Sequence, residues 1–255
     1  MKTGILITAR LGSTRLGRKH LLPVNGVPVI TYLAGRLIRE FEVEIRSGLV
    51  VPVIATSDEP ENRAFETLAT GGLSVFYGSL NNIPLRHLQA AKALSFDNIV
   101  AVDGDDILCS VEGMRAVYEA LKNKAQYVST IGLPFGMNSF GYARRFLEAS
   151  LDGRGGDILE TGWGRIFDAA VLKTIAMPLV ADDPALRFTL DYDDDYMFFK
   201  AVIEALAERV YEATVVEIVE CVRRGGLTRL NARVSEEYWA NFRKNVDKED
   251  KAHGA

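Results

Sequence analysis

Short apolar segments alternate with amphipathic segments along the first half of this 255-residue chain, and this alternation restricts the fold more than any other feature. Apolar runs predict strands over residues 5–8, 49–55, 73–77, 98–102 and 127–131. Apolar residues at helical spacing predict helices over residues 29–39, 60–70, 84–94 and 112–121. Strands joined by helices of about ten residues form right-handed βαβ units and a mainly parallel sheet covered on both faces. The pattern therefore predicts an α/β fold with three α/β/α layers around a twisted sheet.

The second half of the chain departs from this pattern. Glycines are frequent over residues 133–184, which we interpret as an inserted segment that covers a ligand crevice. A further strand is then predicted, and two helices follow it, over residues 186–190, 193–209 and 215–222. The end of the chain, 235–255, is amphipathic and then charged, and we expect residues 246–255 to form a frayed tail. We therefore assign residues 1–255 to a single domain.

Positive charge is concentrated at the start of the chain. Residues 1–39 contain seven Lys and Arg and no Asp or Glu, although the whole chain has a formal net charge of −4. Four of these cations lie in the loop after the first strand, residues 9–19 (the basic loop): Arg10, Arg15, Arg18 and Lys19. With the glycines and hydroxyls of this loop, they could bind an anion as charged as a triphosphate. The alternative is a turn that carries solvated surface charges. Neither G-x-x-x-x-G-K-[ST] nor G-x-G-x-x-G is present, so a phosphate site in this loop would be of another design.

Acidic residues follow two of the predicted strands, as Asp103–Asp106 and Asp191–Asp195. Ligands of parallel α/β sheets bind beyond the carboxyl ends of the strands, so these acids should meet the basic loop in one crevice. Carboxylates held close together need a cation, and oxygen ligands favour Mg²⁺. Asp105 and Asp191 lie nearest the strand ends and are the candidate metal ligands. Asp193–Asp195 can instead be the first turn of a helix, which needs no metal.

Composition excludes several other classes of protein. The chain is 48% hydrophobic and 25% charged, as in soluble globular domains, and its apolar runs are too short for a membrane span or a signal peptide. An acidic pI of about 5.5 argues against nucleic-acid binding. Cys109 and Cys221 lack metal-ligand spacing and are expected to be buried free thiols. We expect a cytoplasmic protein without nucleic-acid or membrane partners.

A polyanion-binding loop, a pair of carboxylates for a hard metal ion and a covering segment together favour nucleotidyl or phosphoryl transfer. In such reactions the protein mainly positions the reactants and neutralises charge on the phosphorus oxygens. The residues by themselves do not select between these reactions, nor do they select a base.

The motifs of the chain resemble those of the acylneuraminate and 3-deoxy-manno-octulosonate cytidylyltransferases, and most closely the spore-coat polysaccharide cytidylyltransferase branch. The first motif, A-R-x-x-S-x-R-x-x-x-K, is present at residues 9–19. The later motifs follow in the same order: Ala55–Asp58, Phe76–Ser79, Arg86, Gly104–Asp105, Pro134–Gly136, Leu186–Asp191 and Asp195. The resemblance covers about residues 4–208. It implies a nucleotidyltransferase-like domain in which a sugar-acid hydroxyl attacks the α-phosphorus of CTP, releasing pyrophosphate and forming a CMP-sugar for surface polysaccharide synthesis.

The resemblance also implies roles for individual residues. Arg10, Lys19 and Asp105 would be catalytic, and Asp105 and Asp191 would bind the Mg²⁺ cofactor. The nucleotide would be bound by Ala9, Arg10, Gly12, Ser13, Arg15, Lys19, Ser57, Asp58, Ser79, Arg86 and Asp103. The partners would be CTP and a small acidic sugar acceptor, and the protein would be a homodimer in which residues 133–184 serve the acceptor side and the dimer contact.

Three departures from the family pattern put the acceptor in question. Gly17-Arg18 replaces the usual Pro-Gly before the lysine, Tyr192 and Asp193 replace a small residue and a proline, and residues 152–165 lack the usual helix and histidine. Candidate acceptor contacts are Asn138, Tyr142 and Trp163, with Arg144 or Arg145, although aromatic residues among glycines can equally be packing plugs. An acceptor that bears a phosphate or phosphonate is the alternative enzyme function. A non-catalytic nucleotide-sugar-binding protein is the alternative from another class.

Overall fold

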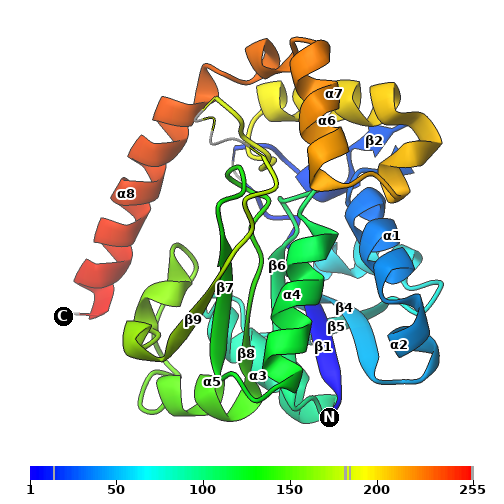
Figure 1. Cartoon of the computed structure of the whole chain (residues 1–255). Coiled ribbons are helices and arrows are strands. Elements are labelled where there is room, and N and C mark those ends of the chain that lie inside the picture. The colour runs from blue at the N-terminus through cyan, green and yellow to red at the C-terminus, as the bar shows by residue number, and fades with distance from the viewer. Residues whose placement is uncertain (14, 181–182, 184, 254–255) are drawn as a thin grey trace.

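The computed structural model describes residues 1–13, 15–180, 183 and 185–253. Its centre is a seven-stranded sheet in the order β5-β4-β1-β6-β8-β7-β9 (Figure 1). The strands are β1 (Thr3–Thr8), β4 (Val50–Ser57), β5 (Ser74–Gly78), β6 (Asn98–Asp103), β7 (Tyr127–Ile131), β8 (Phe140–Ala143) and β9 (Leu172–Ala176). Neighbouring strands are parallel except at β8, which is antiparallel to both β6 and β7. The predicted α/β fold with a mainly parallel sheet is confirmed.

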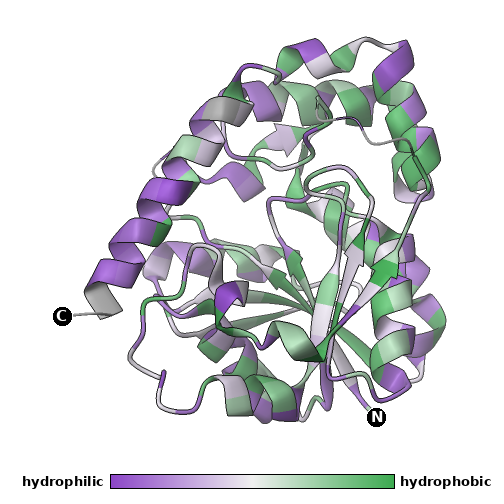
Figure 2. Ribbon diagram, turned by 60° about the vertical axis from the view of Figure 1, so that its left-hand side comes forward, coloured by the Kyte–Doolittle hydropathy of each residue, from purple (hydrophilic) through white to green (hydrophobic). Residues whose placement is uncertain are grey.

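Helices cover both faces of the sheet because successive side chains of a strand point to opposite faces. Ile5 and Ile7 of β1 pack with the helices on one face, whereas Leu6 packs with those on the other. The first face is covered by α1 (Ile30–Glu40) and α4 (Val111–Lys122), and the second by α3 (Ile83–Ala93) and α5 (Arg144–Ser150). The short helix α2 (Glu42–Arg46) leads into β4. Figure 2 shows the hydrophobic residues concentrated in the sheet and the inner faces of these helices.

A second body of helices stands at the carboxyl ends of the parallel strands. It contains α6 (Asp193–Leu206), α7 (Val215–Arg224) and the small hairpin of β2 (Pro23–Val24) and β3 (Val27–Pro28), around a core that includes Phe188, Phe198 and Val219. From it α8 (Val234–His253) runs past the side of the sheet toward the segment that precedes β9 (Figure 1). 3-10 helices link these elements: η1 (Lys19–Leu21), η2 (Pro60–Leu68), η3 (Trp163–Ile166), η4 (Ala169–Val171), η5 (Ala207–Tyr211) and η6 (Leu227–Leu230). Among the described residues, no helix has both the length and the apolarity needed to cross a membrane.

Residues 186–190 are not the predicted strand. Only an isolated bridge between Phe135 and Arg187 forms there, and Leu190 N donates to the carbonyl of Asp105. The alternating residues Leu186, Phe188 and Leu190 are buried as a strand would require, but they enter the core of the second body of helices instead. The chain thereby crosses the strand ends and brings Asp191 over them. Similarly, the helix predicted near residues 60–70 is the 3-10 helix η2.

Residues 133–184 do more than cover a crevice. This segment supplies β8, which lies between β6 and β7, and β9, the edge strand beside β7, so it is partly integral to the sheet. Residues 181, 182 and 184 of the segment lie outside the described residues. The expected frayed tail is also wrong for residues 246–253, which continue α8 and contain the buried side chain of Glu249. Residues 254–255 lie outside the described residues.

Candidate active site

A cavity of about 770 Å³ opens where the basic loop, the end of β6 and α8 face one another. Its volume lies within the range of small-molecule sites in proteins. Side chains of both charge signs line it, as predicted for the carboxyl ends of the strands. The lining residues of the basic loop and of the strand ends include Thr8, Ala9, Arg10, Gly12, Ser13, Arg15, Lys19, Asp103, Asp105, Asp106 and Asp191.

Lys19 lies between the two candidate metal ligands. Its Nζ donates to Asp105 Oδ2 at 2.6 Å and to Asp191 Oδ1 at 3.2 Å, and its side chain is only 7% exposed. Burial lowers the pKa of Lys19, but the two carboxylates outweigh burial and raise the pKa above its ordinary value. Burial likewise opposes ionisation of Asp105, yet Lys19 and His20 hold the pKa of this carboxyl below its usual range. The Lys19 ammonium and the Asp105 carboxylate are therefore charged at neutral pH.

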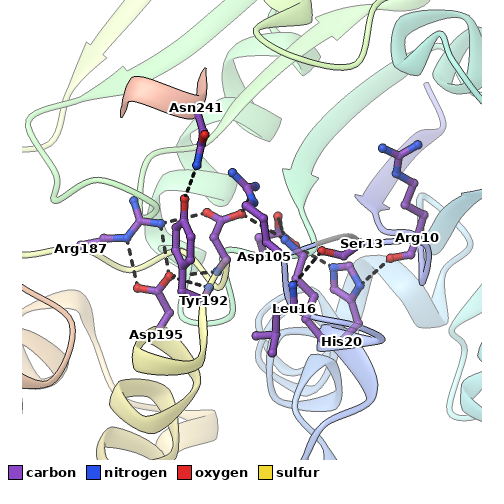
Figure 3. Close-up of polar contacts among 12 residues, drawn as sticks. Arg10, Ser13, Leu16, His20, Asp105, Arg187, Tyr192, Asp195 and Asn241 are labelled. Carbon is purple, nitrogen blue, oxygen red and sulfur yellow. Dashed lines mark hydrogen bonds and ion pairs between the residues drawn. The ribbon is translucent and has the colours of Figure 1, made fainter. Parts of the chain in front are cut away.

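His20 holds Asp105 from the other side (Figure 3). This buried ring places Nε2 2.8 Å from Asp105 Oδ1 and Nδ1 3.1 Å from the carbonyl oxygen of Arg10. Both oxygens of Asp105 are thus held by residues of the same η1 turn. The preceding residue, Arg18, has a positive φ of 53°, which turns the chain so that Lys19 and His20 point inward. His20 is not among the predicted site residues.

Asp191 is held by three cations. Arg15 Nη2 donates to its Oδ1 at 2.6 Å, Arg187 Nη2 donates to its Oδ2 at 2.9 Å, and Lys19 also donates to Oδ1. Arg187 in turn donates to Asp195, which is fully buried and accepts the backbone N–H groups of Asp191 and Tyr192 (Figure 3). Asp195 is therefore a helix cap, and Asp193–Asp195 form the first turn of α6 as the metal-free alternative predicts.

Two further acids lie beneath the basic loop. Burial and the charge of Asp105 raise the pKa of Asp103 to about 7. Burial, with the charges of Asp103 and Asp105, also raises the pKa of Asp106 well above its ordinary value. Asp105 and Asp191, by contrast, both contact the cation Lys19.

Two arginines define the opposite wall of the cavity. Arg10 Nη2 donates to Glu160 Oε2 at 2.5 Å, with 39% of the Arg10 side chain exposed. Arg86 is buried and donates to the carbonyl oxygens of Ser79 and Leu80, so that it fixes the loop between β5 and α3. Burial and the charge of Arg10 lower the pKa of Arg86 to about 10. Glu160 is a site residue that the sequence analysis did not identify.

The structure brings most of the predicted site residues to the cavity. All predicted residues of the basic loop line it, as do Arg86, Asp103, Asp105, Trp163 and Asp191. Thr14 of this loop lies outside the described residues. The charged loop and the distant aspartates therefore meet as the sequence predicts.

Five predicted residues do not line the cavity. Ser57 is buried and its hydroxyl donates to Glu59, whereas Asp58 points outward to Arg63. Ser79 contributes its carbonyl oxygen to Arg86, and Asn138 donates its amide to the carbonyl of Leu133. The hydroxyl of Tyr142 contacts His87 in the core, where Tyr142 is fully buried. Neither Asn138 nor Tyr142 can reach an acceptor, and the candidates Arg144 and Arg145 also lie outside the cavity lining.

Residues of α8 complete the cavity: Tyr238, Trp239, Asn241, Phe242 and Asn245. They lie beyond the part of the chain that carries the family resemblance, so the motifs gave no indication of them. The amphipathic pattern after residue 235 predicts a helix but not the surface that it faces.

The profile of the cytidylyltransferase family matches residues 4–145, which is more than half of the chain. The chain belongs to the cytidylyltransferase family. The match ends after β8, so it covers the basic loop and Asp105 but not Asp191 or α8.

Several known proteins are similar to this cytidylyltransferase family member. An uncharacterized protein of Methanocaldococcus jannaschii is 33% identical over 141 residues, 54% of this chain and 56% of that protein. A 3-deoxy-manno-octulosonate cytidylyltransferase of Rhizobium etli is 34% identical over 133 residues, 50% of this chain and 49% of that protein. The chain thus spans about half the length of the curated relatives it matches.

The similarity to solved structures extends over nearly the whole chain. A cytidylyltransferase from Leptospira borgpetersenii is 28% identical, with a TM-score of 0.74 over 91% of this chain and 98% of that chain. A CMP:2-keto-3-deoxy-manno-octonic acid synthetase complexed with CTP is 15% identical, with a TM-score of 0.59 over 80% of this chain and 99% of that chain. The latter similarity shows a shared fold, which is the predicted nucleotidyltransferase-like fold.

Proposed function

We propose that this protein transfers CMP from CTP to a sugar acid of the 3-deoxy-2-keto type in a Mg²⁺-dependent reaction that releases pyrophosphate. The observation that carries this proposal is the position of Lys19, a buried cation of the basic loop that contacts both Asp105 and Asp191. The family of the chain and the named activity of its Rhizobium etli relative support CTP and a sugar acid as substrates. The resemblance to the spore-coat branch supports a role in surface polysaccharide synthesis.

In this proposal the cations of the basic loop bind the triphosphate. Arg10 and Arg15 are partly exposed to the cavity, and Lys19 lies at its floor, so the three can contact successive phosphates. A hydroxyl oxygen of the acceptor would form a bond to the α-phosphorus and release its proton to water, while the bond from that phosphorus to the bridging oxygen breaks and its electron pair leaves with pyrophosphate. Negative charge then develops on the departing pyrophosphate, where Lys19 and Arg15 can stabilise it.

Asp105 and Asp191 are the residues that would hold Mg²⁺, and they fit it. Both carboxylates approach one cation, Lys19 Nζ, so the protein already stabilises positive charge between them. No group of three or more His, Cys, Asp or Glu side chains suited to a metal occurs among the described residues. A pair of carboxylates is nevertheless sufficient for Mg²⁺, which takes its other ligands from water and phosphate. When bound, the ion would neutralise charge on the phosphate oxygens.

The test is to incubate the protein with CTP, Mg²⁺ and 3-deoxy-manno-octulosonate and to measure pyrophosphate and CMP-sugar. Thermal-shift measurements with CTP, UTP, ATP and GTP should show the largest stabilisation with CTP, because a ligand that binds only the folded state raises its melting temperature. Absence of product with every sugar acid tried would refute the proposed function.

We expect Asp105→Asn to reduce Mg²⁺-dependent pyrophosphate release by at least about 100-fold, because it removes charge that faces the reacting phosphate. The matched control is Asp58→Asn, since Asp58 is exposed and lies outside the cavity. Near-native turnover by Asp105→Asn would contradict the metal assignment. The homodimer, testable by light scattering, and the cytoplasmic location stay predictions.

A further inference from the structure

The C-terminal helix presents one face to the cavity. Tyr238, Asn241 and Asn245 follow one another at intervals of three and four residues, and Trp239 and Phe242 lie beside them at the same helical spacing. All five line the cavity, whereas the Lys and Arg residues of the helix, Arg243, Lys244, Lys248 and Lys251, do not. Much of the rest of α8 is hydrophilic, as Figure 2 shows. The cavity therefore receives the aromatic and amide side chains of α8 but none of its cations.

Contacts at both ends of this face fix α8 relative to the reacting groups. Near its start, Asn241 Nδ2 donates to the hydroxyl of Tyr192, the residue that follows Asp191 (Figure 3). Near its end, buried Glu249 accepts the backbone N–H of Thr161 at 2.8 Å and the guanidinium of Arg165 at 2.9 Å. The helix thus bridges the metal-ligand side of the cavity and the segment that contains Glu160 and Trp163.

Two aromatic side chains of this region remain exposed although they line the cavity. Trp239 is 41% exposed and Phe135 is 37% exposed, and their ring centroids lie 5.2 Å apart. They come from segments about one hundred residues apart, so their meeting is a product of the tertiary structure. Beside them, Asn245 is exposed, and its side-chain amide makes no hydrogen bond to the part of the chain that the structure describes. An exposed aromatic surface beside an amide that has no hydrogen-bond partner is suited to binding a ligand.

We propose that Phe135, Trp239, Phe242 and Asn245 (the α8 wall) bind the sugar ring of the acceptor. The C–H groups of a sugar ring pack against aromatic faces, and its hydroxyls pair with amides such as that of Asn245. Two guanidinium groups lie beside this wall: that of Arg187, 5.5 Å from the ring centroid of Phe135, and that of Arg15, 5.9 Å from the ring centroid of Tyr238. Both already donate to Asp191. Arg187 is 2% exposed and Arg15 is 32% exposed, so of these two only Arg15 is accessible to a ligand. The wall therefore fits a polyhydroxylated acceptor with one carboxylate better than a phosphorylated one.

This inference rests on the proposed function, because it assigns the acceptor of that reaction. Trp239→Ala and Asn245→Ala should be compared with the wild type, with Met197→Ala as the control for loss of a large exposed apolar side chain outside the cavity. The probes are CTP with Mg²⁺ and either 3-deoxy-manno-octulosonate or its 8-phosphate. We expect Trp239→Ala to raise the KM for the sugar acid about tenfold, and Asn245→Ala to raise it several-fold. The KM for CTP and the melting temperature should stay at the values of the Met197→Ala control.

The outcomes separate this inference from the proposed function. If the wild type forms CMP-sugar but both wall variants keep the wild-type KM for the sugar acid, the α8 wall does not bind the acceptor. An equal rise in the KM for CTP would instead assign the wall to the nucleotide, and a preference for the 8-phosphate would also overturn the inference. If the wild type forms no product from any sugar acid, the proposed function itself is refuted.

Discussion

Replacing Arg187 with methionine should destabilise the protein strongly, because it leaves buried carboxylates without their cation. The Arg187 side chain is 2% exposed and lies within 2.9 Å of Asp191 and 3.1 Å of Asp195, whose side chains are 3% and 0% exposed. Breaking such a buried pair from one side costs about 3–5 kcal/mol. For a chain of this size, that loss lowers the melting temperature by roughly 6–20 °C. Methionine retains much of the packing of Arg187 against Tyr238, so the loss should report charge rather than volume.

The matched control is Arg63→Met. Arg63 also contacts two carboxylates, Asp58 and Glu66, and also packs on a tyrosine, but its side chain is 54% exposed. Water and salt screen such a surface pair, so we expect this variant to keep the wild-type melting temperature. Urea and thermal unfolding would measure both variants. Equal stability losses in the two would refute the reasoning that burial sets the strength of the Arg187 contacts.

A double variant tests the same reasoning from the other partner. Asp195→Asn keeps an oxygen that can accept the N–H groups at the start of α6 but removes the charge that Arg187 neutralises. Added to Arg187→Met, it should therefore recover part of the lost free energy of unfolding. Strictly additive losses would show that the two charges are not coupled.

Two further predictions concern parts of the fold outside the site. Burial, and secondarily the charge of Arg86, lowers the pKa of His87 from 6.5 to about 3, so the unfolded chain binds a proton in this window that the folded protein does not. The free energy of unfolding should fall as the pH drops below 6.5, by up to about 1.4 kcal/mol per pH unit. Urea unfolding at several pH values should show a weaker dependence of this free energy on pH for His87→Gln, and an unchanged dependence would contradict the assignment. Gly136→Ala should cost about 3–5 kcal/mol, because φ is +85° and a Cβ would lie 2.2 Å from the carbonyl oxygen of Phe188. Gly153→Ala, at φ +74° with no atom within 4 Å of an added Cβ, should cost only about 1–2 kcal/mol. Similar melting temperatures for the two alanine variants would show that the close contact with Phe188 does not cause the loss of stability.

Local sequence determined the layers of this protein and the chemical character of its site. The apolar periodicity of strands such as β1 and β4 reflects burial on both faces, and burial is a property that hydropathy records directly. The sequence also identified the basic loop and Asp105, because parallel strands bring their carboxyl ends to one edge whatever the details of packing. Asp191 reaches the same edge although the segment before it is not a strand. The same reasoning could not show which side chains line the cavity and which are buried in the core. Phe140 and Tyr142 lie on the same face of β8, yet Phe140 lines the cavity and Tyr142 is buried against His87.

Tertiary structure decided which charges pair and what closes the cavity. Residue 19 meets residues 105 and 191, and residue 10 meets residue 160, through contacts that no local pattern encodes. The helical pattern after residue 235 gave the element but not its position, because the face of α8 is set by the packing of Asn241 and Glu249 against distant segments. Periodicity records whether a side chain is buried, whereas the partner that buries it is selected by the whole fold. For that reason the sequence alone determined the basic loop of this cytidylyltransferase family member, and only the structure placed α8 beside it.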